Sequence, residues 1–148
     1  MADTKTRRLL NVLLGVSNPT YIIYPLQNYA AGAGALVAGA TMTVAAGAWP
    51  AYVDIIAVAF SPAVEFWLVE SMYDTATLAC TIDLQIYNAT VARTVFEDKL
   101  HCTAATMNLG PTVFPFPIHC NAGAQIQGRI GGTAGKTLNV SLLVATGL

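Results

Sequence analysis

The sequence predicts an all-β protein: a single β-sandwich or jelly-roll-like domain with a short N-terminal arm or helix in front of it. The clearest evidence is residues 78–86, where apolar side chains at every second position alternate with Thr81, Asp83 and Gln85. This period of two is typical of a strand with one buried face. Turn residues also separate many short apolar runs, and 148 residues is the size of one domain. We place the arm at residues 1–30 and the sandwich at residues 31–148.

The N-terminal segment combines a basic pair, Arg7-Arg8, with a short apolar run. This combination imitates a secretory signal peptide, but Asp3 lies in the charged part and Asn11 interrupts the apolar part. We expect instead a short amphipathic helix that stops at Gly15 and tethers the domain to a neighbouring subunit. The arm residues assigned to such contacts are Leu9, Leu10, Leu13, Leu14, Tyr21 and Tyr24.

A second segment, Ala30–Phe60, contains Asp54 as its only charge, and its length alone would permit a membrane-spanning helix. However, Leu36–Ala46 consists mostly of Ala, Gly and Thr, which are weakly hydrophobic, and Trp49-Pro50 follows. The next residues are β-branched and aromatic and have the length of a strand. We therefore expect a Gly/Ala-rich loop followed by strands, and no membrane association.

Seven to nine short strands are expected along the chain. Pro25 places the first extended segment at a sheet edge or a bend. We expect a loop tip at Glu97-Asp98-Lys99 and a hairpin loop at Gly131–Gly135. The expected extended segments are Thr20–Tyr29, Thr41–Val44, Tyr52–Phe60, Val64–Met72, Leu78–Ile86, Val91–Glu97, Thr112–His119, Ala124–Ile130 and Lys136–Ala145.

The composition favours a protein that buries much of its surface against other protein. Only 10% of the residues are charged, whereas an average soluble domain has about 25%. The formal net charge is −1, so no global field steers the chain toward nucleic acid or anionic lipid. We expect protein partners and no nucleic acid.

Two features imitate cofactor sites. His101-Cys102 and His119-Cys120 are zinc-ligand types, but neighbours on a strand point to opposite faces and the spacing fits no zinc finger. Gly135-Lys136-Thr137 resembles the end of a phosphate-binding loop, yet that motif needs a glycine where this chain has Ile130. We expect no metal and no cofactor.

The sequence also lacks a recognisable catalytic constellation. No Gly-x-Ser-x-Gly motif is present, and Glu65 and Glu70 have opposite parity on one expected strand. We therefore expect no enzyme and no small-molecule substrate. The three cysteines favour free buried thiols; a Cys102–Cys120 disulfide, or one that involves Cys80, is the alternative.

The C-terminal quarter carries a resemblance to a known class of protein. It runs through a proline-rich apolar strand (Pro115–His119), an Ala122-Gly123 turn, the strand IQGRI (Ile126–Ile130), a glycine loop and a last alternating strand (Thr137–Val144). This order resembles the closing strands of small tailed-phage capsid decoration or cement proteins, although Cys120-Asn121 stands where a proline is commoner. The resemblance implies a β-sandwich that oligomerises, usually as a trimer, and clamps capsid subunits where they meet.

The expected function is accordingly that of a structural virion protein. The chain would be made in the host cytoplasm, form a homotrimer and bind the major capsid protein on the capsid surface. Beyond the arm, the residues expected at subunit contacts are Trp67, Glu70 and Arg129. The alternative is a virion or cell-surface sandwich that recognises a glycan or a receptor, since an exposed aromatic cluster on a sandwich can bind carbohydrate.

Overall fold

The computed structural model describes residues 19–25, 39–75, 80–102 and 107–147. These residues form nine strands and one short 3₁₀ helix, and none of their helices is long and apolar enough to cross a membrane. The elements are β1 (Thr20–Tyr24), β2 (Ala40–Thr43), β3 (Val53–Ile56), η1 (Val58–Phe60), β4 (Phe66–Thr75), β5 (Cys80–Asn88), β6 (Arg93–Cys102), β7 (Met107–Cys120), β8 (Ile126–Gly132) and β9 (Thr137–Thr146).

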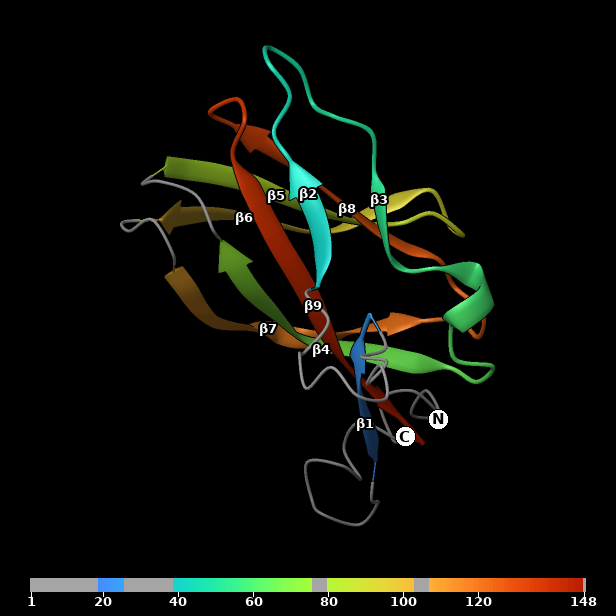
Figure 1. Ribbon diagram of the computed structural model, residues 1–148. Coiled ribbons are helices and arrows are strands. Elements are labelled where there is room, and N and C mark those ends of the chain that lie inside the picture. Colours follow the sequence, from blue (N-terminus) through green and yellow to red (C-terminus); the bar gives the residue numbers. More distant parts are fainter. Residues whose placement is uncertain (1–18, 26–38, 76–79, 103–106, 148) are drawn as a thin grey trace, which may run out of the picture.

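The strands make two antiparallel sheets (Figure 1). The larger sheet has the order β1-β9-β4-β7, and β2 also pairs with β9. Strands β1 and β2 lie end to end along the same side of β9, because β1 pairs with Leu142–Thr146 and β2 with Thr137–Val140. The smaller sheet has the order β3-β8-β5-β6.

The strand order is that of a jelly roll. The eight strands from β2 to β9 divide into β2-β9-β4-β7 and β3-β8-β5-β6. Every connection between consecutive strands changes sheet except the β5–β6 hairpin, which is the double-sheet arrangement known from viral capsid and lectin domains. The predicted all-β sandwich is therefore confirmed.

The core lies between the sheets, and strand alternation builds it. Strand β5 alternates buried and half-exposed residues, with Ile82, Leu84 and Ile86 fully buried. Cys80 belongs to the same buried set, as predicted, and both Cys80 and Cys120 are free thiols. Burial raises the pKa of the Cys120 thiol to about 12 because the charged form loses its hydration.

The predicted hairpin at Gly131–Gly135 is wrong, because the glycine loop between β8 and β9 crosses from the smaller sheet to the larger one and the two strands do not pair. Gly132 has φ +134°, and a methyl group there would lie 2.5 Å from the Thr81 carbonyl oxygen on β5. Gly135 also has a positive φ, +74°, but no atom lies within 4 Å of a methyl group placed on it. Glycine is thus required at the first position by both conformation and close packing, and at the second by conformation alone.

Two predictions on element boundaries are wrong. The expected loop tip at Glu97-Asp98-Lys99 lies within β6, an outer strand of the smaller sheet. Charged side chains are common on edge strands because they discourage further pairing. The expected strand Tyr52–Phe60 stops at Ile56 and turns into η1, so the apolar run there is exposed rather than paired.

Candidate interaction surfaces

The outer face of the smaller sheet carries a cluster built around Arg129. Its guanidinium carbon lies 4.4 Å from the ring centroid of Tyr52 and 4.9 Å from that of Trp49, within the range of cation–π attraction. Arg129 Nε donates to Gln85 Oε1 at 3.0 Å. Tyr52 also stacks on Tyr87, with ring centroids 4.8 Å apart. We call Trp49, Tyr52, Tyr87 and Arg129 the arginine stack.

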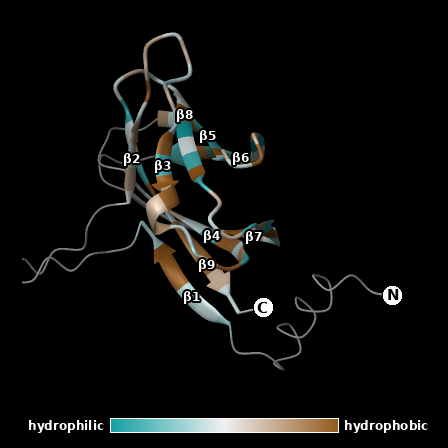
Figure 2. Ribbon diagram, turned by 90° about the vertical axis from the view of Figure 1, so that its right-hand side faces the viewer, coloured by the Kyte–Doolittle hydropathy of each residue, from teal (hydrophilic) through white to brown (hydrophobic). Residues whose placement is uncertain are grey.

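A carboxylate extends this polar surface along β8. Asp54 Oδ1 accepts hydrogen bonds from Gln125 Nε2 at 2.9 Å and from Gln127 Nε2 at 2.7 Å. Gln125, Gln127 and Arg129 alternate with the buried Ile126 and Ile130, so they share one face as predicted. Figure 2 shows hydrophilic colour on strands of the smaller sheet, whereas part of β1 is coloured as hydrophobic.

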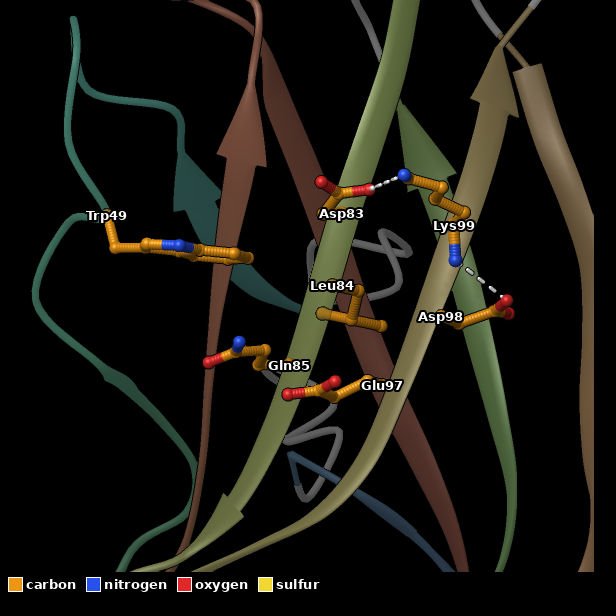
Figure 3. Close-up of a pocket in the computed structure, with 7 residues that line it drawn as sticks. All are labelled: Trp49, Asp83, Leu84, Gln85, Glu97, Asp98 and Lys99. Atoms are coloured by element: carbon orange, nitrogen blue, oxygen red, sulfur yellow. Dashed lines mark hydrogen bonds and ion pairs between the residues drawn. The ribbon is translucent and has the colours of Figure 1, made fainter.

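Two hollows lie beside the arginine stack, and both are lined by Trp49 and Asp83. The first, of ≈400 Å³, is drawn in Figure 3. The second, of ≈260 Å³, lies against the loop at residues 45–48 and the β8 glycines. The first hollow is further lined by Leu84, Gln85, Glu97, Asp98 and Lys99.

The outer face of the larger sheet is mostly apolar. Cross-strand pairing places Tyr21, Ala145, Trp67 and His119 in one row. The next row contains Ile23, Leu143, Glu70 and Val113. Directly paired residues project to the same side, and none of these eight belongs to the core cluster between the sheets. We call these two rows the apolar face.

Strand β7 adds a projecting aromatic ring at the edge of this sheet. Leu68 pairs with Ile118 and Glu70 with Val113, so four residues of β7, 114–117, lie opposite Val69 alone. The segment contains two prolines, which suit an irregular edge strand. Phe116 is 79% exposed in this bulge, the highest value among the exposed large apolar side chains of the described residues.

A second exposed apolar group lies at one end of the sandwich. Val58 and Phe60 of η1 and the nearby Val64 are exposed. This segment is fixed to the β7–β8 turn, because Ser61 Oγ donates to the Ala124 carbonyl and Gly123 N–H donates to the Pro62 carbonyl, both at 2.8 Å. Val58, Phe60 and Val64 are therefore exposed to solvent on a segment that hydrogen bonds hold in place.

The predicted contact residues fall in different places. Arg129 lies in the arginine stack, whereas Tyr21, Trp67 and Glu70 share the apolar face. Tyr21 is exposed and Trp67 is buried, with its ring 5.0 Å from that of His119. Tyr24 is a member of the core cluster, where burial raises the pKa of its phenol. Leu9, Leu10, Leu13 and Leu14 lie outside the described residues.

The histidine–cysteine pairs occupy separate surroundings where the structure describes them. Cys120 is buried in the core, whereas His119 contacts Trp67 on the apolar face, and its Nε2 lies 3.4 Å from Glu65 Oε2. His101 is exposed on β6. Within the described residues, no group of three His, Cys, Asp or Glu side chains is arranged to hold a metal ion.

Sequence reasoning missed the prominence of Phe116 and the role of Trp49. The signal for Phe116 was the alternation Pro-Phe-Pro, which interrupts a regular ladder. No sequence pattern shows that Trp49 meets Arg129, because the two residues are distant in the chain. The exposure of Phe116 and the contact of Trp49 with Arg129 follow only from the three-dimensional arrangement of the strands.

Comparison with known proteins shows no family for this chain. No protein-family model and no curated protein matches the sequence. Among solved structures, a chain from the structure of infectious bursal disease virus, Gx strain, is similar with a TM-score of 0.31 and 12% sequence identity. The match covers 87% of this chain and 33% of that chain, so the present chain spans about a third of its length. A resemblance this distant carries no argument about function.

Proposed function

We propose that this protein is a non-enzymatic structural protein of a virion, which binds the outside of a phage capsid and cements capsomers where they meet. The observation that carries the proposal is the apolar face with its projecting Phe116. Trp67 and Ala145 in the middle of this face are buried, whereas Tyr21, Ile23, Val113 and Phe116 toward its two edges are exposed. A charge-poor domain that exposes such side chains needs a protein partner to cover them.

The composition of this surface suits a protein–protein contact. Aromatic residues are enriched at interface centres, and exposed apolar anchors supply most of the binding energy. Phe116 and Val113 are 79% and 62% exposed on an edge strand, and Tyr21 extends the same sheet surface at its opposite edge. A stable interface buries about 800 Å² on each partner, which requires several such side chains together.

The fold is compatible with this role. Jelly rolls serve in viral capsids and also in lectins, so the architecture alone does not select between these functions. The resemblance of the C-terminal strands to cement proteins favours the capsid. Within the arm of residues 1–30, β1 pairs with β9, so the residues before β1 would add the contact to a neighbouring subunit that their apolar run suggests.

Co-sedimentation with empty shells of the cognate major capsid protein tests the proposal. We expect the full-length protein to pellet with shells as a defined oligomer, with native mass spectrometry giving a trimer. Phe116→Ser combined with Val113→Ser should weaken shell binding at least about tenfold, since each removes an exposed apolar anchor. Ala134→Ser in the β8–β9 loop is the matched control and should bind normally.

Three results would overturn the proposal. One is a monomer that ignores the shells, and another is shell binding unaffected by the double substitution. The third is assembly of the protein alone into closed shells, which would make it a shell-forming subunit rather than a cement.

A further inference from the structure

The groove beside Trp49 has the chemistry of a ligand site that the cementing role does not use. It lies on the smaller sheet, whereas the apolar face belongs to the larger one. Its volume, ≈400 Å³, falls within the range of about 300–1,000 Å³ for small-molecule sites. We propose that this groove binds neutral saccharides, with Trp49 as the stacking surface and the acidic side chains as hydroxyl acceptors.

Trp49 is held in place by groups that leave part of its ring free. The side chain is 40% exposed, although the Arg129 guanidinium lies 4.9 Å from the ring centroid. A methyl group at position 131 would lie 3.2 Å from three carbons of the ring, so a larger residue there would push the indole away from β8 by a few tenths of an ångström. An aromatic ring fixed before binding costs little entropy when a ligand stacks on it, and the C–H face of a pyranose is apolar enough to do so.

The polar side chains opposite Trp49 are planar acceptors. Asp83 and Glu97 lie along β5 and β6 beside the indole, as Figure 3 shows. Carboxylate oxygens accept hydrogen bonds in fixed directions, which suits adjacent hydroxyls of a sugar ring. A saccharide supplies the donors that this acceptor-rich groove requires.

Asp83 keeps acceptor capacity for such a donor. Its side chain is 44% exposed, and the ammonium of Lys99 lies 3.7 Å from Oδ1. That distance gives an ion pair but exceeds a normal hydrogen bond. Because Asp83 lines both hollows, a ligand seated in either one meets this carboxylate.

The charge of the groove selects against acidic ligands. Asp83, Glu97 and Asp98 oppose the single ammonium of Lys99. A sialic acid, a sulfated sugar or a phosphate would therefore meet a net negative surface. The preferred class is an uncharged hexose or a short neutral oligosaccharide that spans the two hollows.

Binding of the full-length protein to an array of neutral and sialylated glycans tests this site. Hits are then titrated as free methyl glycosides of glucose, mannose and galactose, with indole fluorescence as the readout. Trp49 is the exposed indole and Trp67 is 3% exposed, so Trp49 should report the ligand. We expect saturable binding of neutral sugars that falls at least about tenfold in Asp83→Ala by fluorescence. Trp49→Ala lacks the reporting indole, and its binding to the array should fall by at least about the same factor.

The exposed aromatic Tyr21, on the other sheet, provides the matched control: Tyr21→Ala should bind as the unmodified protein does. Thermal unfolding followed by circular dichroism shows whether each variant is folded, and Glu97→Gln serves as a milder test of the same groove. Absence of any neutral-glycan signal, or binding that survives both Trp49→Ala and Asp83→Ala, would overturn the proposal. Preference for sialylated glycans, or quenching by a tetra-arginine peptide and by no sugar, would overturn it as well. None of these outcomes bears on shell binding, so the two proposals fail independently.

Discussion

The guanidinium carbon of Arg129 lies 4.4 Å from the ring centroid of Tyr52, and its Nε donates to the same Gln85 oxygen that accepts the Tyr52 hydroxyl at 3.4 Å. Arg129 on β8, Gln85 on β5 and Tyr52 directly before β3 thus contact one another. The relationship fixes the position of Trp49 above β8. It holds these side chains in a defined arrangement on the outer face of the smaller sheet.

Removal of the Arg129 side chain should destabilise the fold measurably. Arg129→Ala loses two cation–π contacts and a charge-assisted hydrogen bond, and we expect the free energy of unfolding to fall by about 1–2 kcal/mol. Urea denaturation measures this change. Arg93→Ala removes the same charge from an exposed position and should change stability by less than about 0.5 kcal/mol. Equal effects of the two substitutions would show that the stack contributes nothing.

The two positive-φ glycines at and after the end of β8, Gly132 and Gly135, should differ in their tolerance of alanine. Gly132→Ala combines a positive φ with a methyl group 2.5 Å from the Thr81 carbonyl oxygen, and should cost about 3 kcal/mol or more. Gly135→Ala meets open space and carries only the left-handed penalty, about 1–2 kcal/mol. Thermal and urea unfolding of the two variants give the comparison. A larger loss of stability in Gly135→Ala than in Gly132→Ala would contradict the close approach of Gly132 to Thr81.

Stability should fall at high pH because of the Cys120 thiol. Burial raises its pKa from the ordinary 9.0 to about 12, so between these values the thiol ionises in the unfolded chain and not in the folded one. The folded state then binds more protons, and the free energy of unfolding decreases as pH rises from about 9 to about 12. Burial also raises the pKa of Tyr24 and Tyr73, which adds to the same trend.

Urea denaturation across that pH window, in the unmodified protein and in Cys120→Ala, isolates the thiol. We expect the variant to lose roughly 1 kcal/mol less per pH unit than the unmodified protein. Val144→Ala truncates an equally buried residue without a titratable group, so it should lower the whole curve and leave its slope unchanged. Parallel slopes for the unmodified protein and Cys120→Ala would refute the assignment.

Phe114 and Phe116 should have opposite roles although they are two residues apart. Phe114 is 3% exposed and meets Phe96 edge-on with ring centroids 4.6 Å apart, so Phe114→Ala should cost about 3–5 kcal/mol. Phe116 is 79% exposed, and Phe116→Ala should change stability by less than about 0.5 kcal/mol. Denaturant unfolding measures both, and a large loss at Phe116 would mean that it serves the fold rather than a partner.

The sequence was sufficient for the sandwich because alternation is local. Residues 78–86 show which side chains of β5 are buried, and the polar face of Gln125, Gln127 and Arg129 follows from the same period. The glycines of Gly131–Gly135 predicted a loop but not its connection: we expected a hairpin, whereas the loop joins the two sheets, because glycines indicate a turn and do not show which strands pair. The charged residues Glu97–Lys99 predicted a loop but lie in β6, because charged side chains are common on edge strands as well as in loops.

The apolar face and the arginine stack depend on contacts between residues that are distant in the chain, and no local sequence pattern predicts such contacts. Tyr21 and Trp67 share a row only because both lie opposite Ala145 on β9. The bulge that exposes Phe116 arises from the register against β4, and the contact of Trp49 with Arg129 joins a loop to β8. The sequence therefore predicted several of these residues as contacts without predicting where they meet.

Site-specific photo-crosslinking on assembled shells tests the central claim, that the exposed edge of the larger sheet binds the capsid. A benzoylphenylalanine replaces Phe116 in one sample and Thr133, in the exposed β8–β9 loop, in another. Our account predicts a crosslink to the major capsid protein from position 116 and none from position 133. A crosslink from position 133 alone, or none from either position while the protein still pellets with shells, would contradict it.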